Sequence, residues 1–304
     1  MITIFATPKK FEGHIKVIQT NAITSWTLLE PKCEVILFGK EPGTAEIAEK
    51  LNIRHIQDVK TNEFGTPLVN HLFAYAEKVA SFPVLTYVNS DIILCNDFPA
   101  AVGRIKMRKF LLVSRRRNID MESPINFNEK NWTDRLLSQI KLSGTMDSPV
   151  AIDIFVFTRG IWENLPPFAV GRAGYDPRLL YLAYTMNIPL VNITPAVKVI
   201  HQKHLYSHHP DGKNGIYYGE EARRNNEFIK DSLSLFSIAN SSFILTKFGC
   251  LLPVFTLGHL QSALRTAPYR IRSGKTSPLL KLLNNARNYS WILKKIEELE
   301  IKNY

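Results

Sequence analysis

The sequence is poor in cysteine and has no two cysteines placed to act together. Its 304 residues include three cysteines, Cys33, Cys95 and Cys250, which lie far apart in the chain. An odd number of isolated thiols argues against a disulfide framework, and the absence of a C-x-x-C spacing argues against a thiolate zinc site. This cysteine usage predicts a reducing compartment, and therefore a cytoplasmic protein.

Long hydrophobic runs are also missing. Residues 1–6 lead directly into Thr-Pro-Lys-Lys, without the basic stretch, apolar run and cleavage site of a secretory signal. The most apolar later stretch, 243–258, is interrupted by Lys247 and Pro253 and is too short to cross about 30 Å of hydrocarbon. We therefore expect no transmembrane helix.

Three common glycine-containing signatures are absent, namely G-x-G-x-x-G, G-x-x-x-x-G-K-[ST] and G-x-S-x-G. Their absence argues against the most frequent dinucleotide-binding proteins, P-loop nucleoside triphosphatases and α/β-hydrolases. The chain has no internal repeat, and 45% of its residues are hydrophobic. This composition is sufficient for one large domain, with or without a smaller appendage.

Acidic residues are scarce in two regions of this basic chain, whose net charge is +11. Residues 104–117 contain seven Lys and Arg and no acid, and residues 241–304 contain ten Lys and Arg against three Glu. Such clusters favour anions such as phosphates, acidic glycans or anionic lipids, and a solvated basic surface is the simpler alternative. No nucleic-acid-binding motif accompanies the charge, so we expect no nucleic-acid partner.

Short apolar runs alternate with longer segments of helical period over the first two thirds of the chain, which predicts an α/β protein with a mostly parallel sheet flanked by helices. Strands are predicted at 2–6, 34–38, 53–56, 84–88, 110–113, 152–157 and 189–191, and helices at 11–28, 44–51, 68–80, 99–106, 132–142 and 177–186. The polar stretch 118–149 is long for a connection and is interpreted as a loop that borders a site.

The turn-forming residues 210–215 end this alternation. Helices are predicted after them at 219–237 and 278–300. We therefore expect a nucleotide-binding and catalytic domain over 1–210 and a small helical, basic C-terminal extension over 211–304.

Polar residues directly after predicted strands are the first candidates for a site, because ligands of open parallel sheets bind outside the carboxyl ends of the strands. Thr7, Pro8 and Lys9 follow the first strand, where backbone amides and a cation can meet a nucleotide. An ordinary turn is the alternative. Asp91 is a lone acid between two apolar runs, so it requires a hydrogen-bonding partner or a cation. A turn residue that caps the next segment is its alternative role.

Four further charged residues are candidates for a site. Asp176 precedes a proline and an apolar helical run, which is the pattern of a helix N-cap. Asp153 lies inside an apolar strand, where a structurally paired carboxylate is the alternative to a functional one. Arg116 and Arg117 follow a strand and suit bidentate binding of phosphate or an acidic acceptor, whereas Arg115 is interpreted as solvated.

Four histidines occur between residues 201 and 209. Their spacing matches no familiar zinc signature and no cysteine accompanies them, so a closed structural zinc site is disfavoured.

Residues 87–92, Tyr-Val-Asn-Ser-Asp-Ile, resemble the metal-binding D-x-D turn of the GT-A glycosyltransferases, which belong to the nucleotide-diphospho-sugar transferases. The form Asn-Ser-Asp resembles a variant found in a bacterial group. Residues 171–180 and 201–209 resemble, in the same order along the chain, the helix start with its acidic residue and the histidine-rich stretch of that group. The resemblance covers roughly residues 1–210 and implies a GT-A, Rossmann-like fold.

The resemblance also implies a role for each of these residues. Asp91 and His201 would hold a Mn²⁺ or Mg²⁺ ion at the diphosphate, and such ions prefer oxygen ligands. Asp176 would be the catalytic base of an inverting transfer. The nucleotide-diphospho-sugar donor would be bound by Thr7, Pro8, Lys9, Asn89, Ser90, Asp91, Asp153 and Arg116.

This sequence differs from that bacterial group at several positions. Asn89 replaces the first Asp of the motif and removes one negative charge from the metal site. His204 and His208 correspond less clearly to group residues than His201 does, and Leu205 stands where an acidic residue is expected.

The favoured function is sugar transfer to a hydroxyl group of a glycan or lipid-linked acceptor. A nucleotidyltransferase with the same metal and phosphate apparatus is one alternative, and a catalytically degenerate binding module, suggested by Asn89, is another. We expect the basic region 241–304 either to rest on an anionic membrane or to pack as a helical subdomain.

Overall fold

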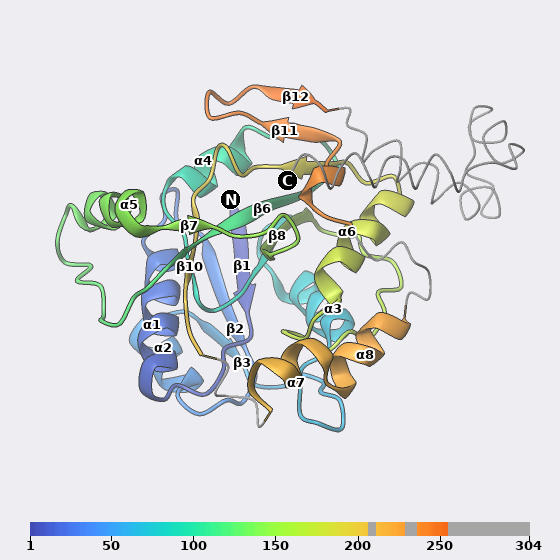
Figure 1. Ribbon diagram of the computed structural model, residues 1–304, viewed down its shortest axis with the longest axis horizontal. Helices are drawn as coiled ribbons and strands as arrows, with labels where there is room; N and C mark the ends of the chain where they lie inside the picture. The colour runs from blue at the N-terminus through green and yellow to red at the C-terminus, as the bar shows by residue number, and fades with distance from the viewer. Residues whose placement is uncertain (206–210, 229–235, 255–304) are drawn as a thin grey trace, which may run out of the picture.

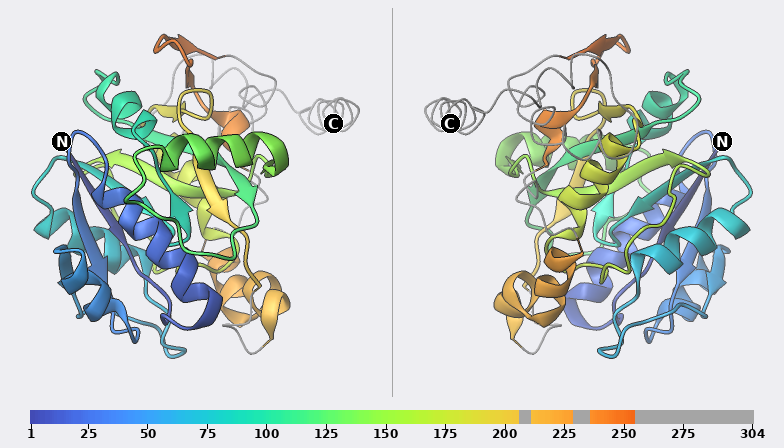
Figure 2. Two further views of the ribbon diagram at one scale, coloured as in Figure 1. Left: turned by 90° about the vertical axis from the view of Figure 1, so that its left-hand side faces the viewer. Right: turned by 90° about the vertical axis from the view of Figure 1, so that its right-hand side faces the viewer.

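The computed structural model describes residues 1–205, 211–228 and 236–254, and it shows a central sheet covered by helices on both faces (Figures 1 and 2). The strands are β1 (Ile2–Ala6), β2 (Glu34–Phe38), β3 (Arg54–Ile56), β4 (Val84–Val88), β5 (Ile92–Ile93), β6 (Leu111–Ile119), β7 (Thr145–Met146), β8 (Ile152–Thr158), β9 (Leu190–Asn192), β10 (Val199–Gln202), β11 (Phe243–Leu245) and β12 (Leu251–Pro253). The helices are α1 (Gly13–Thr27), α2 (Thr44–Lys50), α3 (Val69–Val79), α4 (Asp97–Gly103), α5 (Trp132–Ser143), α6 (Tyr175–Thr185), α7 (Gly212–Tyr218) and α8 (Glu220–Glu227).

The main sheet has the strand order β12-β11-β9-β6-β8-β4-β1-β2-β3. Strands β1 to β4 pair in parallel, and β6 pairs in parallel with β9. β8 runs antiparallel between β4 and β6, so β4 and β6 point in the same direction. The α/β class with a mostly parallel sheet, predicted from the sequence, is confirmed.

Two apolar layers hold the sheet between the helices. Ile4 of β1 packs with α1, α2 and α4, whereas its neighbour Phe5 packs with α3 and α6 on the opposite face. All five residues of β1 are buried. A strand covered on both faces is apolar at nearly every position, and this explains why the central strands were recognisable as continuous apolar runs.

Strand β6 belongs to two parts of the molecule. Residues 111–113 pair with β8 and β9, and the register shifts between Val113 and Arg115. Beyond this irregularity, residues 116–119 pair with β10 and residues 117–118 with β7. Since a bulge bends a strand and redirects its side chains, the second half of β6 leaves the core and carries polar residues to the end of β4. The predicted strand over 110–113 was too short for this reason.

The C-terminal part of the described chain contains α7, α8 and a hairpin of β11 and β12. β11 pairs in parallel with β9, so the hairpin continues the main sheet, as seen at the top of Figure 1. The first part of the helix predicted at 219–237 is observed as α8. The described residues do not include residues 229–235, His208 or the helix predicted at 278–300. Within the described ranges, no helix is long and apolar enough to cross a membrane.

Candidate functional site

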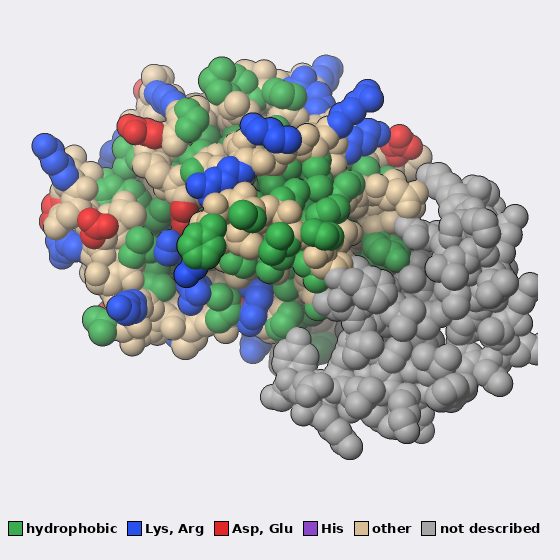
Figure 3. Space-filling view, turned by 90° about the horizontal axis from the view of Figure 1, so that it is seen from above, with side chains coloured by type: hydrophobic (Ala, Val, Ile, Leu, Met, Phe, Trp, Pro, Cys, Tyr) green, Lys and Arg blue, Asp and Glu red, His purple; other side chains and the backbone are tan. Residues whose placement is uncertain are grey.

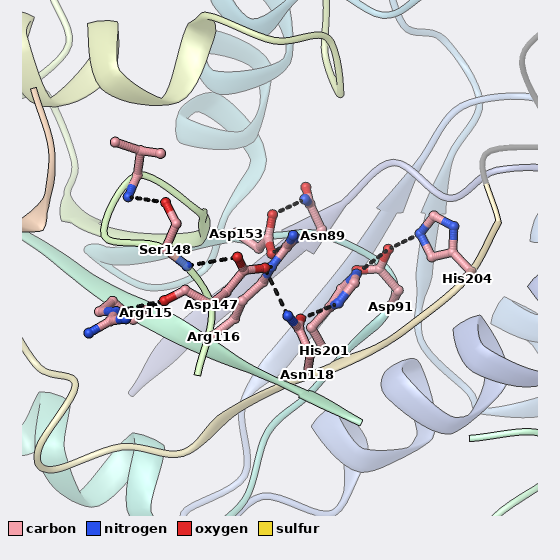
Figure 4. A network of polar contacts seen from close by, with 11 residues as sticks. Asn89, Asp91, Arg115, Arg116, Asn118, Asp147, Ser148, Asp153, His201 and His204 are labelled. Atoms are coloured by element: carbon pink, nitrogen blue, oxygen red, sulfur yellow. Dashed lines mark hydrogen bonds and ion pairs between the residues drawn. The ribbon is translucent and has the colours of Figure 1, made fainter. Parts of the chain in front are cut away.

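Polar segments that follow β1 and β4 meet His201 of β10 and His204, which follows that strand. Lys9 follows β1, and Asn89–Asp91 lie between β4 and β5. β5 pairs antiparallel with β10 and places Ile92 opposite His201. This pairing brings His201 beside Asp91, and Figure 4 shows both side chains in one row with His204.

Asp91, His201 and His204 form a cluster with the composition of a metal site. Their possible ligand atoms all lie within 4.8 Å of one another. Asp91 Oδ2 is 3.1 Å from His204 Nε2 and 3.9 Å from His201 Nε2. Asp91 Oδ1 is buried and has no hydrogen-bond partner among the described residues. A buried carboxylate oxygen that lacks a donor is costly, and a bound cation would satisfy it.

A chain of hydrogen bonds fixes the orientation of His201. The Asn118 amide nitrogen donates to Asp147 Oδ2 over 2.9 Å, which leaves Asn118 Oδ1 as an acceptor. His201 Nδ1 lies 2.8 Å from that oxygen and therefore carries the proton. In the neutral imidazole, Nε2 then presents its lone pair to Asp91, the arrangement found in metal-binding histidines.

His204 is oriented in a similar way. Its Nδ1 lies 3.0 Å from the Leu205 carbonyl oxygen, so Nδ1 is the donor and Nε2 of the neutral ring is an acceptor. A lone pair of Nε2 and Asp91 Oδ2 would then face each other over 3.1 Å. Two acceptors at hydrogen-bond distance repel, and a metal ion between them would remove the repulsion; in the other tautomer, Nε2 donates a hydrogen bond to Asp91 Oδ2.

The charged groups around Asp91 have shifted pKa values. Burial raises the pKa of Asp91, but the hydrogen bond from His204 and the nearby His201 and Lys9 outweigh burial and hold this pKa below its usual range. Burial lowers the pKa of His201, which favours the neutral ring that can bind a metal. Burial also lowers the pKa of Lys9; Asp91 opposes this shift and Arg172 adds to it.

Asp153 and Arg116 form a second polar group beside the cluster. Arg116 Nη1 lies 2.5 Å from Asp153 Oδ2, and Arg116 Nε lies 2.8 Å from Asp147 Oδ2. Burial lowers the pKa of Arg116, but Asp153 and Asp147 raise it to a greater extent. Burial raises the pKa of Asp147, but its hydrogen bonds, with Asn118 first, outweigh burial and bring this pKa to about 2. Arg116 is therefore held by two carboxylates.

The structure supplies a physical reason for an asparagine, and not an aspartate, at position 89. Asn89 Nδ2 donates to Asp153 Oδ1 over 2.7 Å, and Asn89 Oδ1 accepts from the Tyr87 hydroxyl over 3.2 Å. A carboxylate at position 89 would face the carboxylate of Asp153 at hydrogen-bond distance. The amide of Asn89 thus takes part in holding Asp153, and a second carboxylate at position 89 would be repelled by Asp153.

We expect Asn89→Asp to destabilise the protein without improving metal binding. The substitution replaces a hydrogen bond by a repulsion between two half-buried or buried carboxylates, which costs about 1–3 kcal/mol. Thermal melts at pH 7.5 and Mn²⁺ titration would measure both effects. The double variant Asn89→Asp/Asp153→Asn exchanges donor and acceptor and is the matched control, since it should recover most of the lost stability. Tighter Mn²⁺ binding by Asn89→Asp would contradict this account of the motif.

Asp176 lies in the first turn of α6, but it is not the N-cap that the sequence predicted. The N-cap is Gly174, whose φ of 101° is a conformation that favours glycine, and the helix begins at Tyr175. Asp176 Oδ1 is buried and has no hydrogen-bond partner within the described chain. Burial, with Asp153 next, raises the pKa of Asp176 well above its usual range, while Tyr175 and Arg116 act in the opposite direction.

The other predicted residues have the following surroundings. Pro8 and Ser90 are buried, Thr7 is half-buried, and the Ser90 hydroxyl has no partner in the part of the chain that the structure describes. The Lys9 backbone amide donates to Gln19 Oε1 over 2.7 Å, so this amide is not available to a nucleotide, contrary to expectation. The Lys9 side chain lies close enough to Asp91 for the two opposite charges to attract each other.

Arg115 was wrongly interpreted as solvated. It is half-buried, and its Nε donates to the Asp147 carbonyl oxygen over 2.9 Å. Asp147 and Asn118 are site residues that the sequence did not reveal. Both lie in or beside the polar stretch 118–149, where asparagine and aspartate are ordinary loop residues and carry no sequence signal.

A surface cavity of about 270 Å³ lies away from this site, between α5 and the segment that follows β6. Trp132, Ile125 and Arg135 are among its lining residues, and no predicted site residue contributes to it. We place the candidate site at Asp91 because the unpartnered carboxylate oxygens and shifted pKa values gather there, which is the better indicator of chemistry.

Fold and site together describe an α/β protein with a possible Asp-His-His metal cluster at the exit of a central strand. No family model matches the chain, and no curated protein matches it.

Among solved structures, the chain is similar to S. aureus TarS 1–349 in complex with UDP-GlcNAc, with 17% identity over 67% of this chain and 58% of that chain and a TM-score of 0.44. It is also similar to TarS 1–349 without a named ligand, with 14% identity over 100% of this chain and 92% of that chain and a TM-score of 0.45. A third similar structure is the M. tuberculosis glucosyl-3-phosphoglycerate synthase in complex with Mn²⁺, UDP and glucosyl-3-phosphoglycerate, with 15% identity over 74% of this chain and 77% of that chain and a TM-score of 0.42. The chain spans 36% of a further TarS 1–349 chain, determined in complex with UDP.

Proposed function

We propose that this chain is a GT-A glycosyltransferase with the Asn-Ser-Asp form of the D-x-D motif. It moves a sugar from a nucleotide-diphospho-sugar to a hydroxyl group of a glycan or lipid-linked acceptor. The observation that carries the proposal is the cluster of Asp91, His201 and His204 at the exit of β4, with the cation of Lys9 beside it. A divalent cation and a lysine at one sheet edge suit a diphosphate.

Asp91, His201 and His204 would hold Mn²⁺ or Mg²⁺, and the composition of the cluster fits such an ion. When bound, the ion neutralises negative charge on the diphosphate leaving group. Asn118 and Asp147 keep the His201 ring in the tautomer that this role requires.

The donor would lie along the ends of β1, β4 and β8. Thr7 and Pro8 border the nucleoside, the Ser90 hydroxyl has a free hydrogen-bonding capacity within the described chain, and Lys9 neutralises a phosphate. Asp153, held by Arg116 and Asn89, accepts hydrogen bonds from sugar hydroxyl groups. Arg116 is thereby a residue that positions Asp153.

Asp176 would act as the general base. Its carboxylate takes the proton of the acceptor hydroxyl, whose oxygen forms a bond to the anomeric carbon. The bond from that carbon to the diphosphate breaks on the opposite face, and the nucleoside diphosphate leaves, so the configuration is inverted. A carboxylate whose pKa is raised by burial is a stronger base at working pH than an exposed one.

The domain and location assignments are part of the proposal. Residues 1–210 would contain the catalytic apparatus, and 211–304 would be an extension whose basic region contacts the inner face of a membrane from the cytoplasm. Most of that region lies outside the residues described.

A thermal-shift screen of UDP-, GDP-, CMP- and dTDP-sugars with Mn²⁺ tests the function. We expect one nucleotide series to raise the melting temperature, because a ligand at 100 times its Kd adds about 2.7 kcal/mol to the free energy of unfolding. Chelation of the metal should reverse this shift. The stabilising donor, incubated with acceptor extracts, should release a nucleoside diphosphate.

The other outcomes separate the alternatives. Release of pyrophosphate from a nucleoside triphosphate and a sugar phosphate would indicate a nucleotidyltransferase. Binding of glycans without any response to nucleotide or metal would indicate a binding module and contradict the proposal.

A further inference from the structure

The hairpin of β11 and β12 presents apolar side chains to solvent at one end of the sheet. Phe248, in the turn of the hairpin, is 80% exposed and Leu252 is 48% exposed. The hairpin is held firmly below these residues, because Leu245 is fully buried and Phe243 and Leu251 pack against the core. A rigid element thus carries an exposed aromatic ring, which costs hydration free energy unless another surface covers it.

Cationic side chains surround this ring. The Lys247 ammonium group lies over the Phe248 ring, 5.0 Å from its centroid. The Arg104 side chain lies against the same turn, since a Cβ atom built on Gly249 would come within 2.9 Å of it. Arg104 begins a segment in which Lys106, Arg108 and Lys109 are also exposed. The hairpin and residues 104–109 therefore form one surface, which we call the basic hairpin surface.

The two chain segments that form the basic hairpin surface contribute no acidic side chain. Residues 98–109 and 241–254 contain no Asp or Glu. Asp97, just before the first of these segments, is half-buried and forms an ion pair with Lys198. Figure 3 looks onto this end of the molecule and shows lysine and arginine side chains among hydrophobic ones. The occupant of this surface must offer negative charge and an apolar layer together.

The remainder of this chain does not meet that requirement. Residues 255–304 contain nine Lys and Arg against three Glu, so their charge has the same sign as that of the surface. A protein partner is less well matched, because the surface contains three exposed lysines, and lysine is depleted at protein interfaces even though arginine and phenylalanine are enriched there. Lipid headgroups with acyl chains directly beneath them supply both properties, and surfaces that combine Lys and Arg with Phe and Leu are typical of the membrane interface.

We propose that the basic hairpin surface binds an anionic lipid bilayer, with Phe248 and Leu252 entering the headgroup region and the surrounding cations contacting lipid phosphates. This inference deepens the membrane contact proposed above, since it assigns that contact to a described surface; it does not depend on the enzymatic activity, and its test measures none.

Sedimentation of the full chain with vesicles tests the inference. We expect binding to phosphatidylcholine vesicles that contain phosphatidylglycerol, weaker binding to pure phosphatidylcholine, and loss of binding at high salt. Phe248→Ser/Leu252→Ser and, separately, Arg104→Gln/Lys106→Gln should each lower the vesicle affinity by about tenfold, since apolar insertion and headgroup attraction both contribute. Leu142→Ser is the matched control, because Leu142 is 88% exposed on α5 and should not matter.

A second measurement locates the ring itself. Phe248→Trp should add tryptophan emission, relative to the parent chain, that brominated lipids quench. Equal vesicle binding by the parent and the Phe248→Ser/Leu252→Ser variant would overturn the inference and assign binding to another region. Added emission that is blue-shifted without vesicles and insensitive to brominated lipids would also overturn it, since the ring would then be covered by protein.

Discussion

The Asp176→Asn variant is expected to lose sugar transfer by about 10²–10⁴-fold, the usual contribution of a general base. An amide cannot take the acceptor proton, while its size and position in the first turn of α6 are unchanged. If the proposed activity holds, kcat/KM of the parent protein should fall as the pH decreases through the raised pKa of Asp176, because only the ionised carboxylate is a base.

The same substitution should raise the melting temperature at neutral pH. The pKa of Asp176 is higher in the folded chain than its ordinary value of 3.8, so ionisation destabilises the folded state relative to the unfolded one. The asparagine amide carries no charge and removes this cost. Each 1 kcal/mol added to the free energy of unfolding corresponds to an increase of about 2 °C or more in the melting temperature of a chain of this size. Near pH 3, where both states hold the proton, the difference between variant and parent should disappear.

Steady-state kinetics and thermal melts over pH 3–8 would measure these effects, and Asp134→Asn provides the control. Asp134 is an exposed acid in the first turn of α5, where a negative charge is favourable. Its loss should leave activity unchanged and lower the melting temperature slightly, which is the opposite sign. Full activity of Asp176→Asn would refute its role as base and favour a retaining mechanism. A lower melting temperature would contradict the assigned electrostatics.

The Asp91→Asn variant is expected to bind Mn²⁺ about 100-fold more weakly or worse, since loss of residues that merely orient ligands already costs 10–100-fold. Sugar transfer should be lost with metal binding. The stability change has the opposite sign to that of Asp176→Asn, because the pKa of Asp91 is lowered by folding and its ionised form stabilises the folded state. This stabilisation is present above the ordinary pKa of 3.8 and is lost as the pH falls through the lower folded value.

Titration of the protein with Mn²⁺, followed by electron paramagnetic resonance, measures the affinity without an activity assay. Asp120→Asn is the matched control, because Asp120 is an exposed acid that pairs with Lys203, one residue from His204. It should bind Mn²⁺ like the parent protein. Undiminished Mn²⁺ binding by Asp91→Asn would show that the ion, if any, is held elsewhere and would remove the basis for the donor site.

The central part of the fold followed from the sequence because its strands are buried on both faces. Strands β1, β2 and β4 begin and end where the apolar runs predicted, and helix α3 differs by one residue at each end. The short strands β3 and β9 were also found, but β5, β7, β10, β11 and β12 were missed. β5 and β10 have two and four residues, and their pairing joins positions more than 100 residues apart, which no local pattern can reveal. The second half of β6 was also missed, because its three consecutive arginines, 115–117, are not typical of a buried strand.

The site was predictable only where a residue type is unusual in its position. Asp91 stands out as an acid between apolar runs, and the histidines stand out by their number. Asp147 does not stand out in the sequence, although its carboxylate accepts hydrogen bonds from Arg116 and Asn118. Asp176 was misplaced within its helix because Gly174, with its positive φ, is the N-cap and the helix begins at Tyr175, two residues earlier than the proline suggested.

The irregularity of β6 between Val113 and Arg115 sets a strict limit on changes of chain length in this strand. Side chains on a strand alternate, so loss of one residue at Ser114 would place Arg117 and Ile119 where Arg116 and Asn118 now stand. Arg117 would then supply the guanidinium group between Asp147 and Asp153. Ile119 would take the place of Asn118, and its hydrocarbon side chain cannot accept the hydrogen bond from His201 Nδ1. A single-codon deletion in this strand would therefore preserve the core residues 111–113 and remove the hydrogen bond that holds the His201 ring.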